Sequence, residues 1–156
     1  MKNTKQITGR RPLRFHSLDE IVADAETLAS GPIQPLGNWS AGQVFDHLAR
    51  SFSVPLSGVI LPIPWYIRCG ARLLKPYILR AKMSAGIRLD GESAAAMLPQ
   101  PISTEQGLAH LREVIARWKV KTTLPVHSIF GSLTDEEWIQ LQLRHAELHL
   151  SFLTRG

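Results

Sequence analysis

The 156-residue chain contains one cysteine, Cys69, and this shortage excludes a disulfide framework. Disulfides persist in oxidising compartments, so a single thiol favours a reducing one. The N-terminal stretch MKNTKQITGRRPLRF is basic, but it lacks the apolar core of a secretory signal. The sequence therefore predicts a cytoplasmic protein.

The chain also lacks a long uninterrupted apolar run. Its most apolar stretch, VPLSGVILPIPWYI, is broken by Pro55, Pro62 and Pro64 and is too short to cross a bilayer as a helix. We therefore expect no stable membrane insertion. The net charge is +5, but the basic residues are scattered and are not interleaved with aromatic ones. A nucleic-acid partner is not expected, because a nucleic-acid face needs clustered basic residues.

The overall composition is that of a globular protein. Hydrophobic residues make up 44% of the chain and charged residues 20%, which argues against disorder. A chain of this length can bury a full core without disulfides or structural metals. We expect one domain over residues 11–154 and a flexible N-terminus over residues 1–10.

Helix start signals recur along the chain. A capping box, Ser or Thr followed three residues later by Glu or Gln, satisfies two backbone donors at a helix N-terminus. Four such boxes precede apolar residues at helical spacing, at Ser17, Ser40, Ser103 and Thr134. The first helix is predicted to end at Ala29 and the last to run to about Leu153. No segment alternates like a strand, so we predict an all-α four-helix bundle.

A long insertion, residues 54–101, separates the second and third predicted helices. Its centre, WYIRCGARLLKPYILRAKM, has a helical pattern that Pro76 is expected to kink or interrupt. Arg68, Arg72 and Lys75 fall near one stripe of this helix, together with Lys82. They are candidates for an anion-attracting rim or a membrane-surface helix. The alternative, which we favour, is a solvated basic face on a segment that caps the bundle or packs on a second subunit.

The segment RHAELHL near the C-terminus places two histidines four residues apart. On a helix such positions differ by about 40° of rotation, so His145 and His149 share one face. They fall with the apolar stripe of the last helix. A second stripe is predicted to face water and contains Glu136, Gln140, Arg144, Glu147 and Ser151. A zinc-protease site is excluded because its motif needs glutamate directly after the first histidine.

A third metal ligand is predicted from the second helix. His47, in VFDHLA, lies one turn after an inward-facing valine. Three imidazoles would leave an open coordination position for water or substrate. The alternative is three core histidines bonded to backbone or hydroxyl groups, but the ligand pattern favours a metal. His127 and Asn38 are candidates for the mouth of the site or for contacts behind the ligands, although His127 is equally a candidate for a local loop hydrogen bond.

These segments also carry a family resemblance. NWSAGQVFDHLA, FGSLTDEEW and LRHAELHLSFL together resemble the DinB-like superfamily, and more narrowly a branch described only as a domain of unknown function. The resemblance implies a four-helix bundle, often a homodimer, that binds a divalent metal such as Zn or Ni through His47, His145 and His149. It also implies chemistry that uses low-molecular-weight thiols, although the insertion departs from the family pattern.

Two function classes remain open from the sequence. The first is a metal-dependent enzyme of thiol-dependent transferase or hydrolase type, acting on a small-molecule substrate. No carboxylate is predicted to face the three histidines, which suits a metal that activates a thiol or water itself. The second is a non-catalytic bundle with a structural metal or none, which serves as a dimerisation or partner-binding module.

Overall fold

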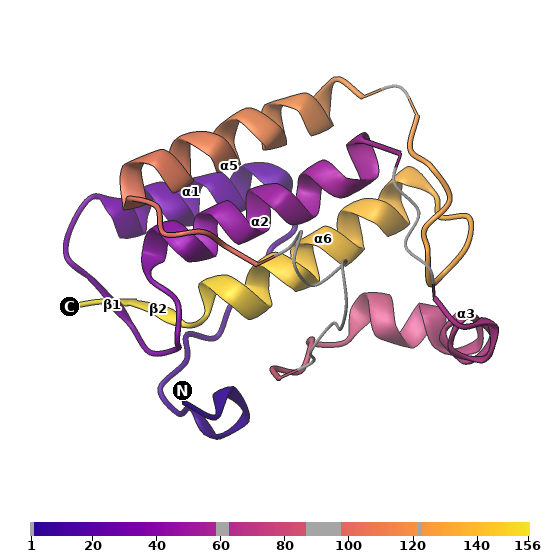
Figure 1. The fold of residues 1–156 in the computed structure, drawn as a ribbon, viewed down its shortest axis with the longest axis horizontal. Helices are drawn as coiled ribbons and strands as arrows, with labels where there is room; N and C mark the ends of the chain where they lie inside the picture. Colours follow the sequence, from indigo (N-terminus) through magenta and orange to yellow (C-terminus); the bar gives the residue numbers. More distant parts are fainter. Residues whose placement is uncertain (1, 59–62, 87–97, 122) are drawn as a thin grey trace.

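The computed structural model describes residues 2–58, 63–86, 98–121 and 123–156. Helices α1 (Leu18–Ala29), α2 (Ala41–Leu56), α5 (Thr104–Lys119) and α6 (Asp135–Leu150) lie alongside one another, and α3 (Trp65–Arg80) lies at one end, near the start of α6 (Figure 1). A short 3-10 helix, η1 (Thr4–Gln6), precedes them. The described chain is mostly helical. None of its described helices is long and apolar enough to cross a membrane.

The capping signals start the four predicted helices where the sequence places them. At the starts of α2, α5 and α6 the box is reciprocal, with the side chains of residues Ser40, Ser103 and Thr134 accepting from backbone amides and those of Gln43, Gln106 and Glu137 accepting in return. The start of α1 differs, because the Glu20 carboxylate accepts from His16 N–H instead of the cap residue. Local hydrogen bonds therefore account for where each helix begins.

The closest helix contact joins the starts of α2 and α5. A side chain added at Gly107 would overlap the backbone of Gly42, and one added at Gly42 would overlap the carbonyl oxygens of Ile102 and Ser103. The two helices approach this closely only because both positions are glycine. Below this contact, apolar side chains of α1, α2, α5 and α6 form one core, in which Phe45, Leu48 and Phe52 of α2 are fully buried.

A small sheet departs from the all-α expectation. Strand β1 (Ile33–Pro35) pairs antiparallel with β2 (Leu153–Arg155), with Ile33 opposite Arg155. The last helix therefore ends at Leu150 instead of running to about Leu153. Three-residue strands are too short to show an alternating pattern, which is why no strand was predicted. The pairing brings the C-terminal end of α6 beside the loop that leads into α2.

The polar stripe predicted to face water on α6 is largely buried, and this prediction was wrong. Glu136 and Gln140 are exposed, but Arg144, Glu147 and Ser151 are 1%, 4% and 1% exposed. The N-terminal segment before α1 covers them. Phe15 N–H donates to Glu147 Oε1 at 2.6 Å, and Arg144 Nη2 donates to Phe15 O at 2.6 Å. A segment distant in sequence thus replaces water along this side of the helix.

Helix α3 continues through Pro76 as a single helix. The solvated basic face expected for it is only partly present: Arg72 is exposed, whereas Arg68 is half-buried and Lys75 forms a 2.7 Å ion pair with Glu137. Several apolar side chains of α3 are exposed as well, with Leu73 84% exposed. Residues 59–62 and 87–97 of the insertion lie outside the described residues.

Candidate metal centre

Three histidines from two helices meet between α2 and α6. His47 projects from α2, and His145 and His149 project from one face of α6. One ring nitrogen of each lies within 4.8 Å of the others, and the ring centroids of His47 and His149 are 4.4 Å apart. These residues could hold a metal ion. The pairing of two histidines one turn apart with a third from the facing helix follows from helical geometry.

The α6 histidines are held in the neutral form that binds metals. Burial and, to a smaller extent, the neighbouring His47 lower the pKa of His145 to about 3. Burial also holds the pKa of His149 well below its ordinary value, with added repulsion from the other two histidines and from Arg10. A neutral imidazole keeps a lone pair on one ring nitrogen, which is the atom that a divalent metal takes.

A serine on α2 sets which nitrogen of His145 carries the proton. Ser51 Oγ lies 3.2 Å from His145 Nδ1 and donates its only proton to Leu48 O at 2.8 Å. The hydroxyl can therefore only accept from the ring, so Nδ1 is the protonated nitrogen and Nε2 carries the lone pair. Outer hydrogen bonds of this kind orient metal-binding histidines in proteins. Ser51 is buried, and it was not among the predicted site residues.

Trp39 is a second residue at the site that the sequence did not single out for it. Its indole stacks on His149, with ring centroids 5.5 Å apart and planes 10° apart, and it also contacts His47 at 4.8 Å. The residue precedes the Ser40 cap of α2, so the local signal indicated only a helix start. Ser51, in contrast, follows His47 by four residues and could have been found from helical spacing.

The three histidines line a cavity of about 1320 Å³. One end is bounded by Trp39 and by Phe152, which follows α6, and the other by Trp138 and Phe130. Apolar side chains of α2, α3 and α6 form most of the wall between them. The lining residues that the structure describes include lysines but no aspartate or glutamate. A metal at the three histidines would therefore have its remaining position toward a space without a carboxylate.

Two residues predicted for the mouth of the site do line this cavity. Asn38 exchanges hydrogen bonds with the Lys2 backbone, at 2.7 Å to its oxygen and 3.0 Å from its nitrogen. His127 Nδ1 accepts from the backbone N–H groups of Ile129 and Phe130 at 3.1 and 3.2 Å, so its proton resides on Nε2. Burial lowers the pKa of His127 to about 4. Its ring is thus a neutral donor in the cavity wall.

The predicted anion rim occupies a different position. Among the described lining residues, Arg68, Arg72 and Lys75 are absent, and Arg72 instead lies against Gly131. The cations that do line the cavity are Lys2, Lys5 and Lys82. A helical stripe shows which residues share one face of α3, but it does not show which part of the protein that face packs against.

The remaining acidic neighbours of the ligands point elsewhere. Asp46 is buried on another side of α2, where it pairs with Arg50 at 2.6 Å and with His110 at 2.8 Å. Glu147 points away from the histidines, as predicted, but into the N-terminal segment. Burial raises the pKa of Glu147, and the hydrogen bond from Phe15 N–H opposes that rise. Neither carboxylate is placed to act as a base at the histidines.

Comparison with known proteins yields one match. A family model described as a protein of unknown function, DUF1569, matches residues 7–156. No curated protein and no solved structure matches the chain.

Proposed function

Because the chain belongs to the DUF1569 family, whose description assigns no activity, we propose a function from the site itself: a metal-dependent enzyme that acts on a small molecule held in the cavity between α2 and α6. His47, His145 and His149 would hold one divalent ion, with Zn or Ni as the expected metals. The observation that carries this proposal is the meeting of three histidine nitrogens within 4.8 Å at the wall of a large cavity.

The donor set fits a catalytic metal better than a structural one. Structural zinc sites are closed by four protein ligands, whereas catalytic sites use three and keep one position open. Among the described residues, the group that could bind the ion consists of the three histidines and no Cys, Asp or Glu. Ser51 orients one ligand, and Trp39 covers another, so the ligands are supported from behind.

The chemistry proposed is that of a thiol-dependent transferase or a hydrolase. A bound divalent ion supplies Lewis-acid activation of a thiol or of water. The chain's own residues supply orientation and exclusion of water: Trp39 shields the imidazoles, and His127 presents a neutral N–H donor in the cavity wall. The absence of a carboxylate base among the described lining residues favours a nucleophile activated by the metal alone.

The finer proposals rest on the resemblance noted from the sequence. We assign the bundle to the DinB-like type, with a low-molecular-weight thiol as co-substrate and a homodimeric assembly. The cytoplasmic location that we propose rests instead on the single cysteine of the sequence. A non-catalytic bundle with a structural metal is the competing function. The lack of a carboxylate among the described lining residues is equally compatible with this function, because a structural site needs no base.

The test is elemental analysis of untagged protein, with a variant that lacks both α6 histidines. We expect about one Zn or Ni per chain in the wild type and none in the His145→Ala/His149→Ala variant. His16→Ala, which removes an exposed histidine, should keep the metal. Wild type that neither contains nor takes up Zn or Ni would refute the metal centre.

A second measurement separates the enzyme from the structural alternative. Protein loaded with Co²⁺ is titrated with 2-mercaptoethanol and followed by absorption. A new near-ultraviolet band from thiolate coordination is expected if a position on the ion is open. An unchanged spectrum at saturating thiol would indicate a closed shell and would favour the structural role.

A further inference from the structure

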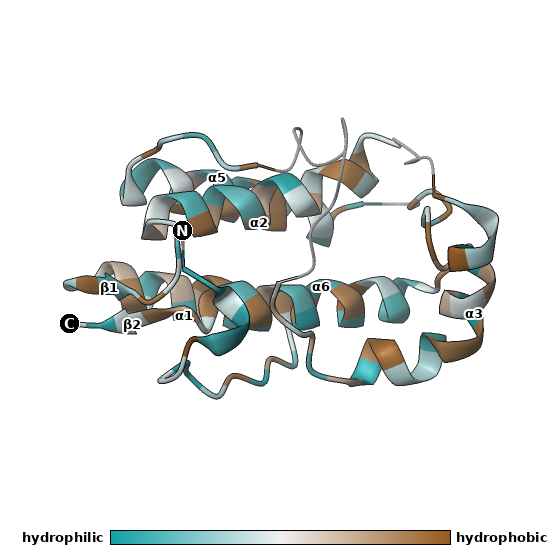
Figure 2. Cartoon of the chain, turned by 60° about the horizontal axis from the view of Figure 1, so that its bottom comes forward, coloured by the Kyte–Doolittle hydropathy of each residue, from teal (hydrophilic) through white to brown (hydrophobic). Residues whose placement is uncertain are grey.

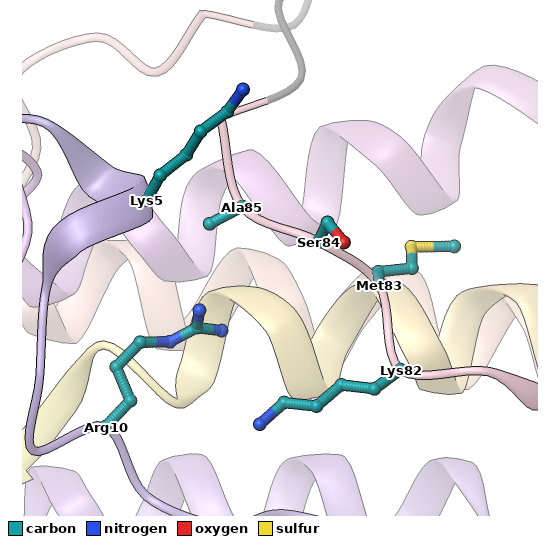
Figure 3. Close-up of a pocket in the computed structure, with 6 residues that line it drawn as sticks. All are labelled: Lys5, Arg10, Lys82, Met83, Ser84 and Ala85. Atoms are coloured by element: carbon teal, nitrogen blue, oxygen red, sulfur yellow. The ribbon is translucent and has the colours of Figure 1, made fainter.

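A second hollow adjoins the histidine cavity. It measures about 500 Å³ and is lined by Lys5, Arg10 and Lys82 with Met83, Ser84 and Ala85 (Figure 3). Lys5, Lys82 and residues 83–85 line the larger cavity as well, so the two spaces share a wall. Three cations thus gather where the segment after α3 passes the N-terminal segment and the end of α6.

Arg10 is the fixed member of this group. Its Nε and Nη2 donate to Ser151 Oγ at 3.0 and 2.7 Å, and Nη2 also reaches Leu148 O at 3.3 Å. The guanidinium stacks over the Phe152 ring, 4.1 Å from its centroid. None of these partners is an acid, so the charge is positioned but not neutralised by any described residue.

Lys82 supplies a second cation to the same hollow. Its side chain is exposed, forms no ion pair with the described residues, and extends toward Arg10 in Figure 3, whereas Lys5 points away from both. The described residues that line the two spaces include no aspartate or glutamate. A hollow walled by unpaired cations attracts an anion, and a rigid guanidinium binds a carboxylate or phosphate with little loss of entropy.

The far end of the larger cavity has the opposite character. Trp138 and Leu141 lie about 16 and about 12 Å from His149 along α6, from a rise of about 1.5 Å per residue. Both are buried, and Phe130 and Ile78 line the same region. The space therefore runs from a cationic mouth, past the histidines, into a region with mostly apolar walls in which His127 packs against Phe130 and Trp138.

We propose that the site binds an amphiphilic small-molecule anion, with its charged group on Arg10 and Lys82 and its apolar body in the cavity between α2 and α6. The assignment of this molecule as substrate rests on the proposed metal-dependent function. The anion subsite itself does not, because neither cation is a candidate metal ligand.

The test compares decanoate, decan-1-ol and acetate in binding to the full-length protein, by calorimetry and by the fluorescence of the cavity tryptophans. Decanoate is expected to bind at least tenfold more tightly than decan-1-ol, which lacks the charge, and than acetate, which lacks the apolar chain. Lys82→Met and Arg10→Met should each weaken decanoate binding several-fold and leave decan-1-ol unchanged. Arg112→Met, which removes an exposed cation on α5, is the matched control and should change neither.

Equal binding of decanoate and decan-1-ol to the wild type would overturn the subsite, as would acetate binding as tightly as decanoate. Lys82 is exposed, so its variant tests the idea even if the Arg10 variant fails to fold. The His145→Ala/His149→Ala protein separates the two proposals. Decanoate binding that persists there supports the subsite whatever the metal analysis shows. Binding that disappears there but is unchanged in both cation variants would assign the carboxylate to the metal and refute the subsite.

A separate observation concerns the outer face of α3. Figure 2 shows brown, hydrophobic stretches along α3. Large hydrophobic side chains that are exposed gather on this helix. They are Trp65, Tyr66, Ile67, Leu73, Leu74 and Tyr77. Tyr66, Leu73 and Tyr77 fall within about 40° of one another at 100° per residue, on the side away from Arg68 and Lys75. Monomeric soluble proteins rarely leave such a patch uncovered.

The charges of α3 indicate what covers it. The helix contains the basic residues Arg68, Arg72, Lys75 and Arg80 and no acidic residue. Arg80 is exposed beside the apolar face, where its long basic side chain can reach lipid head groups. A symmetric contact between two copies of α3 would instead bring like charges together. We propose that α3 docks the protein onto an anionic lipid surface, with Tyr66 and Leu73 in the interface.

Flotation with phosphatidylcholine vesicles that contain 30% phosphatidylserine tests this docking. Binding is expected to weaken with salt, to be lost with pure phosphatidylcholine, and to fall at least fivefold in Tyr66→Ser/Leu73→Ser. Val120→Ser, at an exposed valine after α5, is the control. Absence of binding to the anionic vesicles would refute the proposal. A dimer in sedimentation that the double variant abolishes would assign this face to a second copy instead.

Discussion

Replacing Glu147 with alanine tests whether the buried side of α6 is organised as the structure shows. The carboxylate lies between the ligands His145 and His149 in sequence but faces the N-terminal segment. Its Oε1 accepts from Phe15 N–H at 2.6 Å and forms an ion pair with Arg144 Nη2 at 2.9 Å. Arg144 in turn donates to Phe15 O, so the pair binds both polar groups of one buried backbone position.

The expected loss of stability arises because the truncation leaves Arg144 buried without its partner. Arg144 is 1% exposed, and its Nε and Nη1 already have no hydrogen-bond partner among the described residues. Breaking a buried ion pair by removing one partner costs about 3–5 kcal/mol, because the other charge is left uncompensated. The Phe15 N–H also loses its acceptor, which overlaps with this cost instead of adding fully to it. We therefore expect a loss of about 4 kcal/mol, a large part of an ordinary domain stability.

Urea unfolding followed by circular dichroism measures this loss. With a slope of about 2 kcal/mol per molar urea, the midpoint should fall by about 2 M. Glu136→Ala removes an exposed carboxylate from the same helix and should change stability by less than about 0.5 kcal/mol. A Glu147→Ala midpoint within 0.5 M (roughly 1 kcal/mol by that slope) of the wild type would refute the burial of this pair.

Three further predictions concern the metal centre, the helix contact and the loop before α6. Ser51→Ala removes the hydroxyl that orients the ring of His145, so metal affinity measured by chelator competition should fall about tenfold. Ser53→Ala on the same helix is the control and should leave the affinity unchanged. Equal affinities of the two variants would argue against the assigned ring orientation. Gly107→Ala should destabilise the protein by about 1–3 kcal/mol in urea unfolding, because its side chain meets backbone, while Gly70→Ala on α3 has open space and should be neutral or stabilising. His127, whose pKa burial lowers from 6.5 to about 4, contributes stability that is fully present above pH 6.5 and lost as pH falls toward 4. His127→Asn keeps an acceptor for the loop amides but does not titrate, so its unfolding free energy should fall less over that window; parallel pH profiles would contradict this.

The starts of the helices and the face shared by two histidines could be predicted from the sequence. Both depend on interactions within one helical turn: a cap residue bonds an amide three positions away, and side chains four positions apart project together. The same spacing placed His47 on the inner side of α2. Such features survive wherever the helices are packed, which is why the candidate ligands were found without the fold.

What surrounds those ligands was decided only by tertiary structure. In the sequence, Glu147 and Arg144 belong to a stripe predicted to face water. In the structure Phe15, some 130 positions away, packs against them and binds both side chains. The cations of the hollow that adjoins the cavity are Lys5 and Arg10, from the N-terminal segment, and Lys82, from the segment after α3, and not the stripe on α3. Burial and charge at a site depend on which distant segments meet there, and no local pattern encodes that meeting. The sequence by itself determined which residues can bind a metal, and the packing of distant segments decided what can reach it.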